Sequence, residues 1–265
     1  MIDLICIDVD GTLVGSSGTV PDEVWRTADR LRARGVRLAI CSGRPAFGIT
    51  RGYAERLDAE GWHVFQNGSS VVHLPTGRSL STPLGEDNVR RLVARARETG
   101  RVLELYADDG YVEETGSLVA RRHAALLGLD YVPRSLESIE PACVVRAQWI
   151  IPPDETPVVM AEPSEGLHLS PSTAPLMPDQ VFLNITADGV DKAFAVRALA
   201  RAYDIPLDRV MMVGDGYNDS AAMRAVGFPV AMGNAEPAAR EVARHHVGHV
   251  DEGGLTEALE IALAA

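Results

Sequence analysis

The chain has 265 residues, a formal net charge of −12 and a pI near 5.0. This acidic balance argues against a nucleic-acid backbone as the main partner. We expect no membrane segment and no signal peptide, because no apolar run is long enough to span a bilayer and the chain begins by entering a predicted strand. Its three cysteines, Cys6, Cys41 and Cys143, form neither a disulfide framework nor a metal-spaced cluster, so we expect a reducing cytoplasm.

The first predicted element is a strand that ends in two aspartates. Leu4 to Ile7 is apolar without polar alternation, which is typical of a strand covered on both faces of a parallel sheet. Asp8 and Asp10 follow at the edge where such sheets bind ligands, and the two-residue period points both side chains to the same side. A shared cation would relieve their repulsion. The alternative is an ordinary turn, because Asp-Gly is a common turn pair and Gly11 serves either interpretation.

A helix and a second strand of the same kind come next. Pro21 to Arg34 is predicted as a helix, with proline in its first turn and Gly35 as its stop signal. The mostly apolar run Val36 to Cys41 is predicted as a strand. It leads into Ser42 and Gly43, a hydroxyl beside a glycine whose N–H is sterically free, and this corner has the outline of an oxyanion-binding site.

The middle of the chain is predicted to hold a helix and two strands. Asn88 to Thr99 is helical and rich in arginine; these side chains either hold an acidic partner or form a solvated helix face, which we favour. Val102 to Tyr106 and Tyr111 to Glu113 are predicted strands around a turn at Asp108-Asp109-Gly110. We interpret the two aspartates of that turn as turn formers rather than ligands.

The following residues are rich in proline. Seven of the sixteen prolines lie between Pro152 and Pro178, which predicts an irregular stretch with one short helix at Pro157 to Glu162. Such a stretch either lines a substrate mouth or connects strands.

A single lysine marks the next predicted helix. Of the 25 Lys and Arg side chains, 24 are arginines and one is Lys192, just before the helical pattern Ala193 to Tyr203. Helix amino termini attract anions, so an ammonium in the first turn predicts a phosphate receptor. We hypothesise that a guanidinium would not serve there, because lysine is a compact point charge and arginine a planar fork. The alternative is that the lone lysine is chance.

A third strand of the same kind brings more carboxylates to a strand end. Val210 to Val213 is apolar and leads into a loop with Asp215, Asn218 and Asp219. Carboxylate oxygens are hard ligands that suit Mg²⁺, which binds one or two carboxylates together with substrate phosphate oxygens. Acids, a hydroxyl and a lysine at the ends of successive strands predict one shared site.

Three histidines near the end of the chain raise a zinc hypothesis, which we disfavour. His245 and His246 precede the segment Val247 to Val250, and His249 lies within it. This segment is predicted as a late edge strand. The further ligands that a structural zinc site needs are missing from this segment.

Taken together, these segments resemble the four ordered motifs of the haloacid dehalogenase-like phosphatase superfamily. The closest similarity is to its Cof-type branch, whose members carry a cap domain of type II (C2B-like) between the second and third motifs; Asn67-Gly68 also resembles that branch. The motifs in this sequence are Asp8 to Thr12, Ser42 with Gly43-Arg44-Pro45, Lys192, and Gly214 to Asp219.

The resemblance implies an α/β fold with two domains. A Rossmann-like parallel sheet core with helices on both faces would comprise residues 1–83 and 189–265. Residues 84–188 would form an inserted α+β cap domain that reads the leaving group. The length of the chain agrees with a division into two domains.

The resemblance also implies a role for each site residue. Asp8 would be the nucleophile that attacks a phosphate monoester, and Asp10 would act first as general acid and then as general base. Magnesium would be held by Asp8, the backbone carbonyl of Asp10, Asp215 and, through a water, Asp219. The phosphate would be bound by Ser42, Gly43, Lys192 and Asn218.

We therefore expect a magnesium-dependent phosphatase of a small phosphorylated metabolite, with a sugar phosphate as the leading substrate class. We expect no nucleic-acid or membrane partner, and a monomer or small homo-oligomer. Two alternatives stay open, because fold and motifs fix the chemistry and not the substrate. A phosphomutase would return the phosphoryl group to a sugar, and a phosphometabolite-binding protein would bind without turnover.

Overall fold

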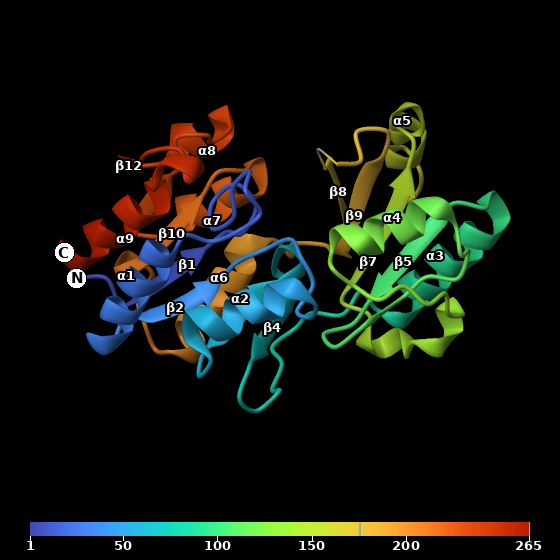
Figure 1. The fold of residues 1–265 in the computed structure, drawn as a ribbon. Helices are drawn as coiled ribbons and strands as arrows, with labels where there is room; N and C mark the ends of the chain where they lie inside the picture. Colours follow the sequence, from blue (N-terminus) through green and yellow to red (C-terminus); the bar gives the residue numbers. More distant parts are fainter. Residues whose placement is uncertain (175, 265) are drawn as a thin grey trace. The chain divides into compact units, whose positions relative to one another are not determined.

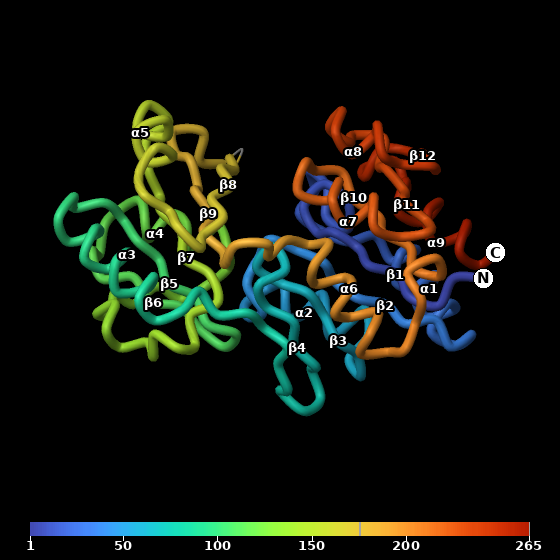
Figure 2. The backbone as a smooth tube through the Cα atoms, turned by 180° about the vertical axis from the view of Figure 1, so that it is seen from behind, coloured from blue at the N-terminus to red at the C-terminus, as the bar shows by residue number. Residues whose placement is uncertain are grey.

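The computed structural model describes residues 1–174 and 176–264, and the chain forms two compact units. The first unit comprises residues 1–44, 51–80 and 191–265, and the second comprises residues 45–50 and 81–190. Each unit builds its own sheet (Figure 1). Both chain ends lie in the first unit, where helix α1 (Asp22–Ala33) contacts helix α9 (Gly254–Ala264) (Figure 2).

The first unit is built on a parallel sheet of five strands in the order β12-β11-β10-β1-β2. All four residues of β1 are fully buried, as its lack of polar alternation predicts. The predicted α/β fold with a parallel core sheet is therefore confirmed. The five strands are β1 (Leu4–Ile7), β2 (Arg37–Ile40), β10 (Val210–Gly214), β11 (Phe228–Ala231) and β12 (His245–His246).

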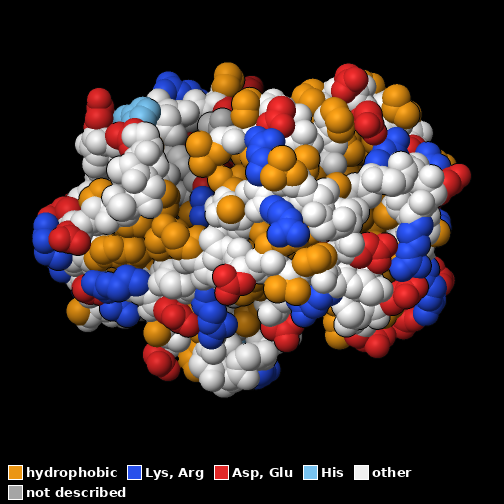
Figure 3. Space-filling model, turned by 45° about the vertical axis from the view of Figure 1, so that its right-hand side comes forward, with side chains coloured by type: hydrophobic (Ala, Val, Ile, Leu, Met, Phe, Trp, Pro, Cys, Tyr) orange, Lys and Arg blue, Asp and Glu red, His pale blue; other side chains and the backbone are white. Residues whose placement is uncertain are grey.

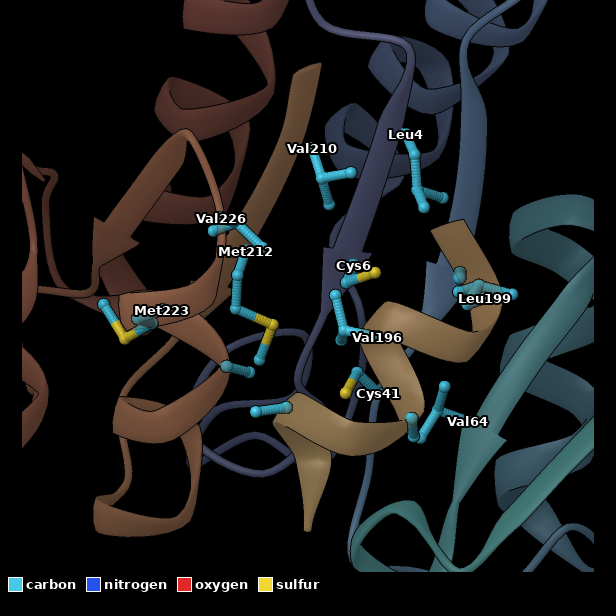
Figure 4. Close-up of a cluster of buried hydrophobic side chains, with 14 of the residues drawn as sticks. Leu4, Cys6, Cys41, Val64, Val196, Leu199, Val210, Met212, Met223 and Val226 are labelled. Atoms are coloured by element: carbon cyan, nitrogen blue, oxygen red, sulfur yellow. The ribbon is translucent and has the colours of Figure 1, made fainter. Parts of the chain in front are cut away.

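Apolar side chains of this sheet pack against helix α6 (Lys192–Ala202), which carries Lys192. Leu4 and Cys6 of β1 and Met212 of β10 meet Val196 and Leu199, which project from helix α6 (Figure 4). This packing fixes the start of α6 relative to the strand ends. Two further helices of the first unit are α7 (Ser220–Ala225) and α8 (Pro237–Val242). Helix α2 (Ile49–Asp58) belongs to this unit from residue 51 onward.

A short hairpin extends the first unit beside β2. Strand β3 (Trp62–Phe65) pairs antiparallel with β4 (Ser70–His73), and the turn between them is a 3₁₀ segment, Gln66–Gly68. A parallel bridge between Cys41 and Val64 places β3 alongside the residue that follows β2. The hairpin turn is thereby brought to the same edge as the loop after β2.

The second unit is an antiparallel sheet of five strands in the order β6-β5-β7-β9-β8. One apolar cluster joins this sheet to helix α3 (Glu86–Thr99), and a smaller one joins it to helix α4 (Leu118–Leu126). The unit is therefore of the α+β type. Its strands are β5 (Val102–Tyr106), β6 (Tyr111–Val112), β7 (Arg146–Ile151), β8 (Leu167–Ser172) and β9 (Val181–Ala187).

Residues 45–50 belong to the second unit because an aromatic stack holds them there. The ring of Phe47 lies 6.5 Å from the ring of Tyr106 and 6.1 Å from that of Tyr111, and all three are stacked. The predicted division places these six residues in the core. It differs from the structure because the stack joins residues that are far apart in the sequence, which no local pattern indicates.

The structure corrects two of the predicted elements. The proline-rich stretch holds one short helix, α5 (Thr156–Met160), but it also holds strand β8 and is not irregular throughout. Pro171 is tolerated because β8 is an edge strand, where a missing N–H breaks no central ladder. The late edge strand is β12, which includes the first two histidines, and not Val247 to Val250.

Arg90, Arg95 and Arg97 of α3 form ion pairs within their own unit. Arg90 pairs with Glu86 and Asp87, and Arg95 pairs with Glu98 and Glu162. Acidic and basic side chains are interspersed on the surface (Figure 3), which favours the solvated-face interpretation. No helix among residues 1–174 and 176–264 is long and apolar enough to cross a membrane.

Candidate active site

Three neighbouring strands of the first unit end at one edge of the sheet. Strands β10, β1 and β2 are adjacent, parallel and in register. The residues that follow them therefore meet at the carboxyl edge, where open α/β sheets bind ligands. Asp8 follows β1, Ser42 lies two residues beyond β2, and Asp215 follows β10.

The lone lysine lies buried between two of the predicted acids. Lys192 Nζ donates to Asp8 Oδ1 and to Asp219 Oδ1, each at 2.6 Å. The side chains of Lys192 and Asp219 are fully buried, and that of Asp8 is 9% exposed. Helix α6 begins at Lys192 because the side chain of Asp191 caps it, accepting from the N–H of Phe194 at 2.7 Å. The helix start thus aims the ammonium at the strand ends.

Burial and like charges shift the pKa values of this group. Burial raises the pKa of Asp8 well above its usual range, although the Lys192 ammonium lowers it. Burial and the Asp219 carboxylate raise the pKa of Asp215 to about 6. Burial alone would favour a neutral Lys192, but the carboxylates of Asp219 and Asp8 outweigh it and raise its pKa. One ammonium thus faces three carboxylates, which leaves an excess of negative charge.

Asp219 organises the loop after β10. Its Oδ2 accepts from the N–H groups of Asp215 at 3.1 Å and Gly216 at 2.9 Å, while its Oδ1 accepts from Lys192. A Cβ on Gly214 would lie 2.5 Å from the Asp219 carboxyl carbon, so this approach requires glycine. Both Asp219 oxygens therefore have protein donors, and the carboxylate holds Asp215 in place.

The acids of this site suit a divalent cation. Carboxylate oxygens of Asp8, Asp215 and Asp219 lie within 4.8 Å of one another. Hard oxygen donors, partial burial and uncompensated negative charge match what Mg²⁺ requires. These residues therefore fit the predicted metal, which would also relieve the repulsion that raises the pKa of Asp215.

The Asp10 side chain is outside this acidic group and is paired with Arg44 instead. Arg44 Nε donates to Asp10 Oδ2 at 2.9 Å, and a second guanidinium N–H donates to Oδ1. The Asp10 side chain is 61% exposed. Its predicted metal contact through the backbone carbonyl stays a prediction. Arg44 belongs to the second motif but has no predicted role; two-point contact with a carboxylate is typical of arginine.

The predicted phosphate ligands Ser42, Gly43 and Asn218 come together around one further residue, Asn67. Ser42 is fully buried, and its hydroxyl accepts from the N–H of Arg44 at 3.1 Å. Asn218 Nδ2 donates to Asn67 Oδ1 at 3.0 Å. A Cβ on Gly43 would lie 3.0 Å from the same oxygen. The sequence predicts no site role for Asn67; the pair Asn67-Gly68 only resembles a motif of the Cof-type branch.

Two further polar residues without a predicted role hold Asp215. Thr12 Oγ1 donates to Asp215 Oδ1 at 2.9 Å, and Asn234 Nδ2 donates to Asp215 Oδ2 at 3.2 Å and to the carbonyl of Gly11 at 2.8 Å. A Cβ on Gly11 would lie 2.2 Å from Asp215 Oδ2, and its φ is +81°, so this turn needs glycine. Thr12 stands within the first motif, whereas Asn234 has no sequence signal because only the fold brings it here.

A protein family and curated proteins match most of this chain. The family model of haloacid dehalogenase-like hydrolases matches residues 5–141 and 169–259. The chain is 22% identical to the 5-amino-6-(5-phospho-D-ribitylamino)uracil phosphatase of Bacillus subtilis, over 97% of this chain and 94% of that protein.

Two solved structures share the fold over the whole chain. The phosphatase BT1666 of Bacteroides thetaiotaomicron superposes with a TM-score of 0.82 at 23% identity, covering 100% of this chain and 96% of that one. The subclass IIB sugar phosphatase BT4131 gives a TM-score of 0.82 at 20% identity, covering 99% and 100%.

Proposed function

The chain belongs to the haloacid dehalogenase-like hydrolase family, and we propose that it is a magnesium-dependent phosphatase that acts on a sugar phosphate. Its relatives are named phosphatases, and the chain is an enzyme that hydrolyses phosphoric monoesters.

One observation carries the proposal: the buried Lys192 ammonium contacts Asp8 and Asp219 beside a third carboxylate, Asp215. Such a group is poorly suited to a structural role, because like charges at short range raise the free energy of the folded state. It is well suited to a phosphate group and a cation, which would neutralise the acids and use the ammonium.

In the first half of the reaction, Asp8 attacks the substrate. One of its carboxylate oxygens forms a bond to phosphorus while the bond from phosphorus to the leaving oxygen breaks. Asp10, once protonated and released from Arg44, gives its proton to that oxygen, so the product leaves as an alcohol. Lys192, Ser42 and Asn218 bind the other phosphate oxygens.

In the second half, water releases the phosphate from Asp8. Asp10 now accepts a proton from the attacking water, whose oxygen bonds to phosphorus as the bond to Asp8 breaks. Free phosphate leaves and the Asp8 carboxylate is restored. Asp8, the backbone carbonyl of Asp10, Asp215 and, through a water, Asp219 would hold magnesium, which when bound lowers the repulsion between nucleophile and phosphate.

Two further observations support a sugar phosphate as the substrate and a cytoplasmic location. The solved structure BT4131 is a sugar phosphatase of the same fold. Cys6, Cys41 and Cys143 are all free thiols, which fits a cytoplasmic protein.

The test is phosphate release from a panel of phosphorylated sugars and small phosphorylated acids, with and without Mg²⁺. We expect release that needs the metal, is strongest on sugar phosphates and is abolished by Asp8→Asn. Asp58→Asn is the matched control, because Asp58 is a buried aspartate outside the site, and it should keep the activity.

Other outcomes would overturn parts of the proposal. An isomerised sugar phosphate without free phosphate would identify a phosphomutase. Tight binding of a compound without release would identify a binding protein. Release that is indifferent to Mg²⁺, or that Asp8→Asn leaves intact, would remove the proposed mechanism.

A further inference from the structure

The turn between β3 and β4 has three consecutive residues with positive φ. The φ angle is 53° at Gln66, 55° at Asn67 and 98° at Gly68. Among residues 1–174 and 176–264, Asp204 is the one other non-glycine residue in this region. Left-handed backbone is strained for side chains other than glycine, and such strain persists only where surrounding contacts hold it. Gln66 and Asn67 are two adjacent non-glycine residues with this strained backbone, so contacts around the turn must hold them.

Backbone hydrogen bonds attach this turn to the loop after β2. The N–H of Gln66 donates to the carbonyl of Arg44 at 2.9 Å, and the N–H of Asn67 donates to the carbonyl of Ser42 at 3.0 Å. These two carbonyls flank Gly43 on either side. The turn thus fixes the backbone of the loop proposed to bind phosphate.

The same turn touches the start of α6. A Cβ on Gly68 would lie 2.1 Å from the carbonyl oxygen of Asp191 and 3.1 Å from the nitrogen of Lys192. Only a glycine permits this approach, which packs the turn directly under the residue that carries the ammonium. The turn therefore supports two of the phosphate-binding segments through its backbone.

A third segment is reached by a side chain. Asn67 Oδ1 accepts from Asn218 Nδ2 at 3.0 Å, across 151 residues of sequence. Glycine at position 43 leaves the space in which this bond forms. A glycine at position 67 would relieve the backbone strain, so the asparagine offers one thing that glycine lacks, namely this contact with Asn218.

We propose that Asn67 is a positioning residue that orients the Asn218 amide toward the phosphate group of the substrate. The inference rests on the proposed function, because Asn218 has a phosphate to bind only if the site is a phosphatase site. Asparagine suits the role, since among residues with side chains it adopts left-handed backbone most readily.

The test replaces Asn67 by glycine. Asn67→Gly keeps the left-handed backbone and removes only the side chain, and Asp204→Gly makes the matched change at the exposed end of α6. We expect both variants to show the same small change in Tm. Asn67→Gly should lower kcat/KM for phosphate release by about tenfold, the size of one lost hydrogen bond in the transition state, and Asp204→Gly should leave it unchanged.

A double-mutant cycle tests whether Asn67 acts through Asn218. Adding Asn67→Gly to Asn218→Ala should lower kcat/KM by less than about twofold more, because the contact is already gone. Inhibition by inorganic phosphate should weaken in both single variants and not in Asp204→Gly. A merely structural role would move Tm and leave the phosphate inhibition constant unchanged.

The outcomes separate this inference from the proposed function. If the wild-type protein releases phosphate and Asn67→Gly releases it equally fast, the positioning role is wrong and the phosphatase stands. If the effects of Asn67→Gly and Asn218→Ala are additive, Asn67 does not act through Asn218. Wild-type protein that releases no phosphate removes the proposed function and this inference together.

Discussion

The first unit buries Lys192 with Asp8 and Asp219 and places Asp215 beside them, whereas the second unit buries Glu104 in a set of complementary donors. Glu104 is fully buried; its Oε2 accepts from the Tyr106 hydroxyl at 2.6 Å and from Gln148 Nε2 at 3.0 Å. Its Oε1 lies 3.0 Å from a ring nitrogen of His123. Among the described residues 1–174 and 176–264, no second carboxylate is a hydrogen-bond partner of Glu104.

A buried arginine completes the polar cluster of the second unit. Arg146 donates to Asn184 Oδ1 at 2.6 Å and to Gln148 Oε1 at 3.0 Å, and its guanidinium lies 4.1 Å from the centre of the Tyr106 ring. One carboxylate and one guanidinium therefore balance each other there. The difference is that an excess of like charge marks a site for a ligand, while a compensated network marks a structural element.

The largest effect should come from changing the shape of the buried cation. Lys192→Arg keeps the charge, but a planar guanidinium does not fit the fully buried position between two carboxylates. We expect phosphate release to fall by about a thousandfold, comparable to the loss of a preorganised donor. Arg201→Lys, at the exposed end of the same helix, is the control and should leave the rate unchanged. An unchanged rate in Lys192→Arg would show that the shape of lysine does not matter.

The compensated network should respond in stability rather than in metal binding. Glu104→Gln puts an amide nitrogen among donors and leaves the Arg146 charge without its carboxylate, so the free energy of unfolding should fall by about 3 kcal/mol. Urea denaturation measures this, with the exposed Glu98→Gln as the control. If instead Glu104→Gln is as stable as the wild type but loses Mg²⁺ affinity, the distinction between the two clusters fails.

His63 sharpens the comparison, because it is a buried titratable group of the first unit with complete partners. Its Nδ1 accepts from the N–H of Ile40 at 3.0 Å, its Nε2 donates to the carbonyl of Asp58 at 2.8 Å, and burial lowers its pKa to about 4. The unfolded chain then binds more protons than the folded one between pH 6.5 and 4. The contribution of His63 to the free energy of unfolding is therefore fully present above pH 6.5 and is lost as the pH falls toward 4.

This linkage predicts a loss of about 2 kcal/mol of unfolding free energy between pH 7 and pH 5. Replacing the ring by His63→Asn retains an acceptor for the N–H of Ile40 and should remove that part of the pH dependence. His246→Asn, at an exposed histidine, is the control and should leave the pH dependence unchanged. Equal pH profiles for the wild type and His63→Asn would show that His63 does not carry the effect.

The smallest effect should come from the arginine-rich face of α3. The Arg90 side chain is 61% exposed, and its partners Glu86 and Asp87 are 48% and 96% exposed. Arg90→Ala should shift Tm by no more than about 1 °C, because exposed ion pairs are screened by water and salt. A shift several times larger would mean that this helix has a structural role that its exposure does not indicate.

Three motifs of the candidate site could be found in the sequence because each lies within a few residues of a strand end. Asp8, Ser42 and Asp215 are local signals, and parallel strands bring such residues to one edge. Asn234 could not be predicted, since its partners stand far away in the sequence and no pattern marks it. Strand β8 could not be predicted either, because it contains Pro171, which normally argues against a strand and is tolerated only at a sheet edge.

The buried cluster of the second unit was hidden for a different reason. Glu104 and Arg146 alternate with apolar residues along β5 and β7, and this alternation normally indicates a side chain in water. The pairing of three strands places these residues side by side, and their burial and hydrogen bonds show that this polar face is covered and internally bonded. Local pattern fixes which residues share a face, and the fold decides whether that face is buried.

Calorimetric titration with Mg²⁺ tests the central claim most directly, because it measures whether the charge excess of the first unit is a cation site. The wild-type protein should bind one Mg²⁺ per chain, Asp215→Asn should bind it at least tenfold more weakly, and Glu104→Gln should bind it as the wild type does. Absence of binding in the wild type, or equal affinity in Asp215→Asn, would contradict the account.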